Sequence, residues 1–216
     1  MSDQSRPFNP LEKRHLGESV GQALLRQPAS PLSTLQPFEG AGIYAIYYSG
    51  DFPAYEIIAE RNTGSRFGAP IYVGRAVPKG ARKGGNLDLE PGRVLFNRLK
   101  QHRRSIEQVS NLSMEDFHCR HLVVDDIWIP LGESLLIATF APIWNTLIDG
   151  FGNHDPGGGR HAGIRPRWDV IHPGRPWAEN CRPRDETADQ IIRETKDHLR
   201  NNPPPNDLSD DLGRPV

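Results

Sequence analysis

The chain is poor in cysteine, and its two cysteines, Cys119 and Cys181, cannot build a disulfide framework. It contains no run that approaches the ~18 apolar residues of a membrane-spanning helix. Its first residues, MSDQSRPFNP, lack the apolar core of a secretory signal. These absences argue against a disulfide-stapled secreted fold and against a membrane protein, and they favour a reducing cytoplasm.

The chain is also poor in apolar residues. They make up 36% of its 216 residues, and the mean hydropathy is −0.59. By contrast, it contains 21 glycines and 20 prolines. The length predicts one domain with a proper core rather than two, and the composition predicts that part of the chain lies in loops or in a tail.

A formal net charge of −1 hides an uneven distribution of charge. Residues 75–104 hold nine lysines and arginines but two acids, and residues 154–184 hold six arginines and three histidines against three acids. A cluster of acids follows in the tail from Asp185 onward. A basic face beside an acidic tail favours a polyanionic partner, although the same charges also fit an ordinary solvated surface.

The pattern of apolar residues predicts both strands and helices. Three segments are rich in β-branched and aromatic residues and are predicted strands: 42–48, 69–74 and 116–125. A further segment, residues 54–59, fits either a weak strand or a short helical turn. Four segments have helical spacing: 16–25, the basic stretch that begins at Pro91, 132–140 and 185–199.

Two short motifs, Gly42-Ile43-Tyr44 and Tyr72-Val73-Gly74, lie in predicted strands. In the basic helix that follows them, Arg98 and His102 are four residues apart and therefore share a face. A guanidinium can hold two phosphate oxygens in a fork, and an imidazole can accept a proton near neutral pH. Surface residues of an ordinary basic helix would show the same spacing.

Glu133 and Asn145 come next along the chain. Glu133 is expected in the first turn of the apolar helix, where a charge stabilises the helix by ~0.3–1 kcal/mol. It also fits a ligand of one hard cation such as Mg²⁺, and no basic residue lies near it in the sequence. Asn145 follows Pro142-Ile143-Trp144 and fits either a helix cap or a residue that orients a catalytic side chain.

In this order, over about residues 40–147, the motifs resemble the GIY-YIG nuclease superfamily. Its pattern is GIY, then YIG, then an arginine on a helix with a Tyr, His or Lys one turn later, then a glutamate and an asparagine. The resemblance implies an α+β fold with a small, mainly antiparallel three-stranded sheet flanked by helices. It also implies a nuclease site made of Tyr44, Tyr72, Arg98, His102, Glu133 and Asn145.

The resemblance divides the chain into four parts. Residues 1–38 are expected to form an N-terminal arm, and residues 39–150 the nuclease core with an insertion at 49–68. Residues 151–200 are expected to form an Arg/His-rich extension for DNA recognition together with the C-terminal helix. Residues 201–216, which contain three consecutive prolines, are expected to be a disordered tail.

Two positions depart from the superfamily pattern. Val73 replaces the usual isoleucine, which is a harmless change at a buried β-branched position. A stretch of 27 residues between Tyr44 and Tyr72 replaces a tight hairpin, which predicts either an insertion or a different strand pairing. Together with His102 and the Arg/His-rich extension, this spacing resembles type II restriction endonucleases of SacII-like specificity, which read the palindrome CCGCGG.

The resemblance implies metal-dependent hydrolysis of double-stranded DNA. Tyr44 would take the proton of the attacking water, and Tyr72 would help to place the water or the phosphate. Arg98 would clamp the scissile phosphate, and Glu133 would hold one Mg²⁺ ion per site. Because an ordinary tyrosine pKa of about 10 is too high for a base, His102 and the metal are expected to assist.

A target made of G·C pairs predicts arginine or lysine donors to guanine O6 and N7, although the same side chains equally fit phosphate contacts. The candidates are Arg75, Lys79, Arg82, Lys83, His154, Arg160, Arg165, Arg167 and Arg175. A palindrome matches a two-fold symmetric homodimer. By family analogy, the resemblance also implies a cognate DNA methyltransferase in the same restriction-modification system and a bacterial cytoplasm as the location.

Other functions stay open at this point. A homing or repair nuclease would share the site but carry a larger DNA-binding domain, and a decayed nuclease fold would bind DNA without cleaving it. A zinc site at His118, Cys119 and His121 competes with the simpler interpretation of a buried strand cysteine. An HNH-type nuclease would use His154 and His161.

Overall fold

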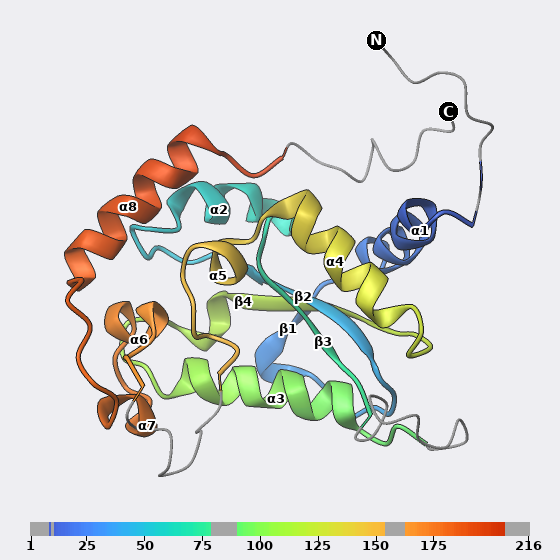
Figure 1. Ribbon diagram of the computed structural model, residues 1–216, viewed down its shortest axis with the longest axis horizontal. Coiled ribbons are helices and arrows are strands. Elements are labelled where there is room, and N and C mark those ends of the chain that lie inside the picture. The colour runs from blue at the N-terminus through green and yellow to red at the C-terminus, as the bar shows by residue number, and fades with distance from the viewer. Residues whose placement is uncertain (1–8, 10, 79–89, 154–162, 206–216) are drawn as a thin grey trace.

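The structure, a computed structural model, describes residues 9, 11–78, 90–153 and 163–205. Its centre is an antiparallel sheet with the strand order β1-β4-β2-β3 (Figure 1). The strands are β1 (Ser30–Pro31), β2 (Gly42–Tyr48), β3 (Pro70–Ala76) and β4 (Phe117–Val123). The α+β class and the three long strands confirm the sequence prediction. The short β1, which pairs with β4, was not predicted.

Helices surround this sheet in the described residues. They are α1 (Lys13–Leu25), α2 (Glu56–Arg61), α3 (Val94–Glu107), α4 (Ile129–Phe140), α5 (Ile143–Thr146), α6 (Arg167–Ile171), α7 (Pro176–Glu179) and α8 (Ala188–Asn201). The 3-10 helices are η1 (Leu32–Thr34), η2 (Thr63–Ser65) and η4 (Met114–Asp116). Within the described ranges, none of the helices is both long enough and apolar enough to cross a bilayer.

Strand β2 is the central strand of the core, because it lies between β4 and β3 and every one of its residues is buried. Tyr44 and Ile46 belong to the core on one face of the sheet, which includes residues of α3, α5, α6 and α8. Ile43 and Ala45 belong to a second core with residues of α1 and α4. The fold therefore has three layers, with the sheet in the middle (Figure 1).

Local chemistry explains where the helices begin. Helix α4 starts at Ile129, earlier than predicted, because Pro130 fits the first helical turn. Glu133 consequently lies in the second turn, and the prediction that it lies in the first turn was wrong. Helix α8 starts at Ala188, where the side chains of Thr187 and Gln190 form a capping box.

The long connection between β2 and β3 is an insertion that leaves their pairing intact, since Tyr44 lies opposite Gly74 in an antiparallel register. Residues 56–61 of this insertion form the helix α2 rather than a strand. The buried Asn62 amide closes the insertion at its base. It donates to the carbonyls of Tyr48 and Ala69 at 2.8 and 2.9 Å and accepts from the Ala69 N–H at 3.0 Å. The end of β2 is thereby fastened next to the start of β3.

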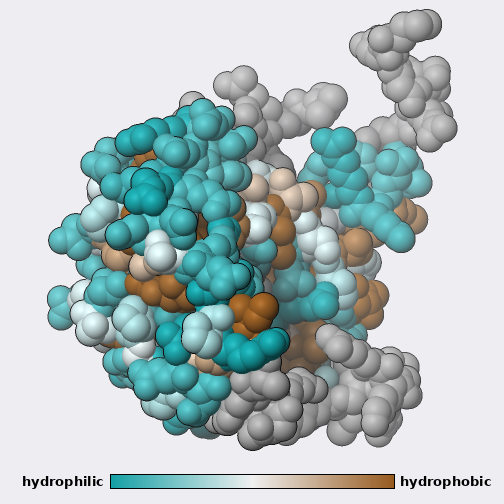
Figure 2. All heavy atoms as spheres, turned by 60° about the vertical axis from the view of Figure 1, so that its left-hand side comes forward, coloured by the Kyte–Doolittle hydropathy of each residue, from teal (hydrophilic) through white to brown (hydrophobic). Residues whose placement is uncertain are grey.

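The C-terminal part of the chain packs on the face of the sheet that α3 covers. Trp168 of α6 and Ile191 and Leu199 of α8 belong to the same buried cluster as Leu99 of α3. Helix α8 turns the predicted apolar face inward and leaves its polar residues outside. Figure 2, in which this side of the molecule comes forward, shows a mostly hydrophilic surface with small scattered apolar patches.

A buried hydrogen-bond network joins the insertion to the C-terminal part. The Tyr55 hydroxyl lies 2.7 Å from His172 Nε2 and accepts from the Trp144 indole N–H at 3.0 Å. His172 Nδ1 lies 3.0 Å from Asn111 Oδ1. Burial, and secondarily the charge of Arg175, lower the pKa of His172 to about 3. The folded protein therefore holds this imidazole neutral.

This histidine predicts an acid-dependent loss of stability. In the unfolded chain His172 binds a proton near its ordinary pKa of about 6.5, whereas in the folded protein it binds one only near pH 3. The contribution of neutral His172 to the free energy of unfolding is complete above pH 6.5 and decreases as the pH falls toward 3. Between pH 7 and pH 5 the loss is about 2 kcal/mol in the free energy of unfolding.

Urea denaturation at both pH values measures this loss. His172→Gln has no imidazole to titrate. In this variant, the difference in the free energy of unfolding between pH 7 and pH 5 is expected to be smaller by that amount. The variant should be less stable than the wild type at pH 7, because the network is altered. An unchanged difference between the two pH values would contradict a neutral, buried His172.

Candidate active site

Tyr44 and Tyr72 lie together on neighbouring strands, with ring centroids 6.2 Å apart. The strand register produces this approach, because Tyr44 lies opposite Gly74 and Tyr72 lies opposite Ile46. A Cβ at residue 74 would come within 2.4 Å of the Tyr44 hydroxyl. Residue 74 must therefore be glycine, because the Tyr44 phenol occupies the space of a side chain there. The two predicted motifs lie together in one place.

Helix α3 adds Arg98 and His102 to the tyrosine pair. His102 Nε2 lies 2.6 Å from the Tyr44 hydroxyl, and both side chains are buried. The His102 ring also contacts Tyr72 edge-on, at 5.2 Å between centroids. Arg98, one turn earlier, acts on both tyrosines through its charge and hydrogen bonds. The shared face that the spacing of four residues predicted is thus directed at the tyrosines.

Burial dominates the acidity of the two phenols. It raises the pKa of Tyr44 well above the ordinary value of 10, and the neighbouring Tyr72 raises it further, while Arg98 lowers it. Burial likewise raises the pKa of Tyr72, again against the effect of Arg98. Both phenols are therefore protonated at neutral pH in this state. Tyr44 can become a base only by passing its proton on or by gaining positive charge nearby.

Glu133 has a basic partner that the sequence did not reveal. Its Oε2 atom lies 3.1 Å from Nε of Arg75, which β3 places next to Gly74. Burial raises the pKa of the Glu133 carboxyl, while the charges of Arg75 and Arg98 lower it. Arg75, predicted as a DNA contact, is therefore engaged with the carboxylate of the site in this structure.

Asn145 of α5 is neither a helix cap nor a direct partner of a catalytic side chain. Its amide accepts from the Val73 N–H and donates to the Val73 carbonyl, each at 2.8 Å. Because β3 is the last strand of the sheet, these two groups lie on its outer edge. Val73 stands between Tyr72 and Gly74, so Asn145 fixes the backbone of the second motif.

The loop Gly150–Asn153 contacts three of the predicted site residues, and the sequence did not indicate this role. Phe151 stacks on the His102 ring with centroids 4.6 Å apart and planes inclined by 18°. The Gly152 carbonyl accepts from Arg98 Nη2 at 2.9 Å. A Cβ on Gly152 would lie 2.6 Å from the Tyr72 hydroxyl. The only signal in the sequence was the short Gly-Phe-Gly run.

Three arginines of the C-terminal part, all predicted as DNA contacts, bind partners within the protein. Arg165 donates to the carbonyls of Ala178 and Glu179. Arg167 binds Glu186, Glu194 and the Leu147 carbonyl. Arg175 is 1% exposed and pairs with Asp169. The three arginines that the sequence predicted as DNA contacts thus have partners within the protein in this structure.

Five further predicted DNA contacts, Lys79, Arg82, Lys83, His154 and Arg160, lie outside the described residues. The same is true of His154 and His161 as HNH-type residues. In the part of the chain that the structure describes, no group of three or more His, Cys, Asp or Glu side chains could hold a metal ion. The zinc site at His118, Cys119 and His121 is therefore not supported.

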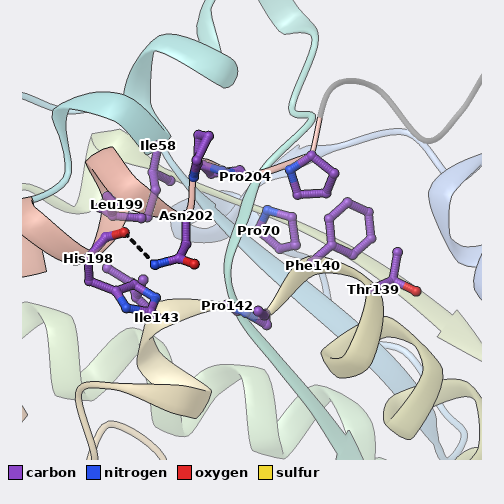
Figure 3. A pocket seen from close by; sticks show the side chains of 13 residues that line it. Ile58, Pro70, Thr139, Phe140, Pro142, Ile143, His198, Leu199, Asn202 and Pro204 are labelled. Carbon is purple, nitrogen blue, oxygen red and sulfur yellow. Dashed lines mark hydrogen bonds between the residues drawn. The ribbon is translucent and has the colours of Figure 1, made fainter.

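The described residues also form a pocket of about 170 Å³ away from the tyrosine pair (Figure 3). It lies between the end of α8 and the turn that joins α4 to α5, and its lining includes Phe140, His198, Leu199 and Pro204. None of the six predicted catalytic residues lines it. Its lining carries neither a carboxylate nor an arginine, so it does not suit phosphodiester chemistry.

One comparison with known proteins identifies a family. Residues 36–199, more than half of the chain, match a family model described as the Eco29kI GIY-YIG domain. The matched range contains every residue of the tyrosine site, from β2 to the loop Gly150–Asn153. No curated protein matches the sequence.

The contact between Asn145 and Val73 predicts a pH-dependent defect. In Asn145→Asp the ionised carboxylate can still accept from the Val73 N–H but faces the Val73 carbonyl without a proton to donate. We expect a loss of about 1–3 kcal/mol in the free energy of unfolding at pH 7. Relative to the wild type, part of it should return near pH 4, where a protonated carboxyl can donate again.

Urea denaturation at both pH values provides the measurement, and Asn145→Ala is the control because it has no group to titrate. The stability gap between Asn145→Ala and the wild type should be the same at pH 7 and pH 4. Equal pH behaviour of the Asp and Ala variants would show that the side chain of residue 145 does not hold the edge of β3.

Proposed function

The protein belongs to the Eco29kI GIY-YIG family of restriction endonucleases, and on that premise we propose that Tyr44 is the general base of phosphodiester hydrolysis in double-stranded DNA. The observation that supports this assignment best is the 2.6 Å contact between the Tyr44 hydroxyl and His102 Nε2. A buried phenol needs an acceptor for its own proton before it can accept one from water. His102 is that acceptor.

The proton transfer follows from this contact. The Tyr44 hydroxyl gives its proton to His102 Nε2, which leaves a phenolate beside an imidazolium. The phenolate then takes a proton from the attacking water, and the hydroxide forms a bond to phosphorus. The departing oxygen of the DNA strand leaves with the electrons of the broken P–O bond. The positive charge of Arg98 favours the phenolate, since it lowers the pKa of Tyr44.

Arg98 is also the proposed phosphate ligand. Its guanidinium can hold two phosphate oxygens in a bidentate fork, and the two tyrosines that it contacts would then lie beside the scissile phosphate. Tyr72, which is partly exposed, would place the water or the phosphate through its hydroxyl. Asn145 supports this arrangement from a distance, because it fixes the strand that carries Tyr72.

The residues fit one Mg²⁺ ion held by Glu133. Mg²⁺ accepts a single protein carboxylate and completes its shell with waters and substrate oxygens, and Glu133 offers one largely buried carboxylate beside the tyrosines. When bound, the ion would supply positive charge that lowers the pKa of water and stabilises the leaving oxygen. Arg75 orients the carboxylate through their 3.1 Å contact.

The finer biological role remains part of the proposal. We propose a type II enzyme that acts as a homodimer on a G·C-rich palindrome, with CCGCGG as the target, beside a cognate methyltransferase in a bacterial cytoplasm. The support is the spacing of the motifs and the basic segments that follow them. Since Arg165, Arg167 and Arg175 are engaged internally, base reading is assigned to other basic residues, with His154 and Arg160 foremost.

Replacing Tyr44 by phenylalanine tests the general base. Cleavage of plasmid DNA in the presence of Mg²⁺ is expected to slow by ~10²–10⁴-fold, because the proton acceptor is removed. DNA binding should be retained, since the phenol is fully buried. The control is Tyr47→Phe, a buried tyrosine of the same strand whose hydroxyl binds Arg120 in the opposite core. A Tyr44→Phe protein that cleaves at the wild-type rate would reject the assignment.

Mapping the ends of digested DNA tests the sequence specificity and the metal together. Discrete fragments that end within CCGCGG are expected with Mg²⁺, and none after chelation. Glu133→Gln should need a higher Mg²⁺ concentration or lose cleavage, because an amide is a weaker ligand for a hard cation. Random nicking would reject the restriction target but keep the nuclease. Binding without cleavage under any divalent cation would identify a non-catalytic DNA-binding module.

A further inference from the structure

The loop Gly150–Asn153 contacts the candidate site without supplying an ionisable side chain to it. Phe151 lies flat on His102, and the Gly152 carbonyl binds Arg98. The Gly152 backbone also packs so closely on the Tyr72 hydroxyl that a Cβ there would lie 2.6 Å away. The position of this loop therefore sets the positions of the proposed proton acceptor, phosphate ligand and second tyrosine.

The guanidinium of Arg175 binds three backbone carbonyls of this loop. Arg175 Nη2 donates to the Gly150 carbonyl at 2.9 Å, and Nη1 donates to the carbonyls of Phe151 and Asn153 at 3.3 and 3.2 Å. Its remaining donors are directed at Asp169, with Nε 2.6 Å from Oδ1 and Nη2 2.5 Å from Oδ2. Three carbonyls of a four-residue loop thus converge on one side chain.

The surroundings fix this guanidinium rigidly. It lies between two indoles, with its central carbon 4.4 Å from the Trp168 ring centre and 4.7 Å from that of Trp177. The side chains of Arg175 and Asp169 are each 1% exposed. A buried ion pair is costly to desolvate, and well-packed apolar residues often serve stability equally well. Stability alone is therefore a weak reason for an arginine here, whereas convergent binding of three carbonyls requires its fork of donors.

We propose that Arg175, oriented by Asp169, is a positioning residue of the nuclease site, which acts through the loop Gly150–Asn153 on Arg98, His102 and Tyr72. This inference rests on the proposed function. Lysine cannot take over the role, because its ammonium is a single point of charge and cannot reach three carbonyls and a carboxylate in fixed directions. Arg175, which the sequence suggested as a base-contacting residue, is thus assigned an indirect role in catalysis.

Single-turnover cleavage with excess enzyme tests this role. Folded enzyme is kept in saturating excess over DNA, so the rate constant reports cleavage of bound DNA, and a variant that merely folds poorly keeps the wild-type rate constant. In Arg175→Lys the rate constant is expected to fall about 10- to 100-fold, as for other small displacements of catalytic groups. The affinity for the same DNA without a divalent cation is expected to stay within about two-fold.

The matched control is Arg120→Lys. Arg120 also donates to carbonyls, those of Gln27 and Phe67, and its guanidinium also stacks on an aromatic ring, that of Tyr47 at 4.9 Å. It lies on the opposite face of the sheet, where it binds Tyr47 instead of the tyrosine site. This variant should lose stability but keep the wild-type rate constant.

Gly152→Ala provides a second variant that leaves Arg175 untouched. The added methyl group would collide with the Tyr72 hydroxyl, so the loop or the phenol must move, and the rate constant should again fall by about ten-fold or more. The thermal unfolding temperature should change little, because Gly152 is not a core residue.

The outcomes separate the two proposals. If the wild type cleaves and Tyr44→Phe does not, but Arg175→Lys and Gly152→Ala keep the wild-type rate constant, the positioning role is overturned and the proposed function stands. Equal decreases in the Arg175→Lys and Arg120→Lys rate constants would also overturn the positioning role, since the effect would then be general. A wild-type protein that cleaves no DNA would overturn both proposals.

Discussion

The 2.6 Å contact between the Tyr44 hydroxyl and His102 Nε2 is the constraint on which most of the structure depends. The contact requires Tyr44 on the central strand β2 and His102 on α3 to face each other. It also requires a residue without a side chain at Gly74, opposite Tyr44. Burial on both faces fixes the strand, because a slip of one residue would turn the phenol into the opposite core. The insertion after β2 is tolerated because Asn62 closes it before the pairing with β3 is disturbed.

Local pattern predicted the strands and the long helices, because those elements depend on residues that are close in sequence. The fixed order of the motifs predicted that Tyr44 and Tyr72 lie together. The partner of Glu133 could not be predicted, because Arg75 reaches it only through the packing of α4 on β3. The internal partners of Arg175 could not be predicted for a related reason. The sequence of an arginine-rich segment does not reveal whether the guanidiniums donate to DNA phosphates or to carbonyls of the protein itself.

Among the described residues, two buried tyrosine–histidine pairs share a hydroxyl-to-Nε2 contact, and their surroundings differ. Tyr55 and His172 form a 2.7 Å contact very similar to that of Tyr44 and His102. The first pair is enclosed by indoles and an asparagine, and the low pKa of His172 keeps it from accepting a proton in the physiological range. The second pair has Arg98 beside it. Each pair has an arginine charge nearby, because Arg175 lowers the pKa of His172 and Arg98 lowers the pKa of Tyr44. Side-chain identity therefore does not by itself distinguish the pair that we propose as catalytic from the structural one.

The position of Asn145 has a consequence for how the protein behaves among copies of itself. Strand β3 is an edge of the sheet, and an exposed edge is a template on which another chain can add a strand and begin to aggregate. The asparagine amide occupies both outward hydrogen-bonding groups of Val73 in the manner of a one-residue strand. An incoming strand would first have to displace α5. The residue that fixes the second tyrosine motif thus also protects the sheet against intermolecular pairing at the strand that carries part of the candidate active site.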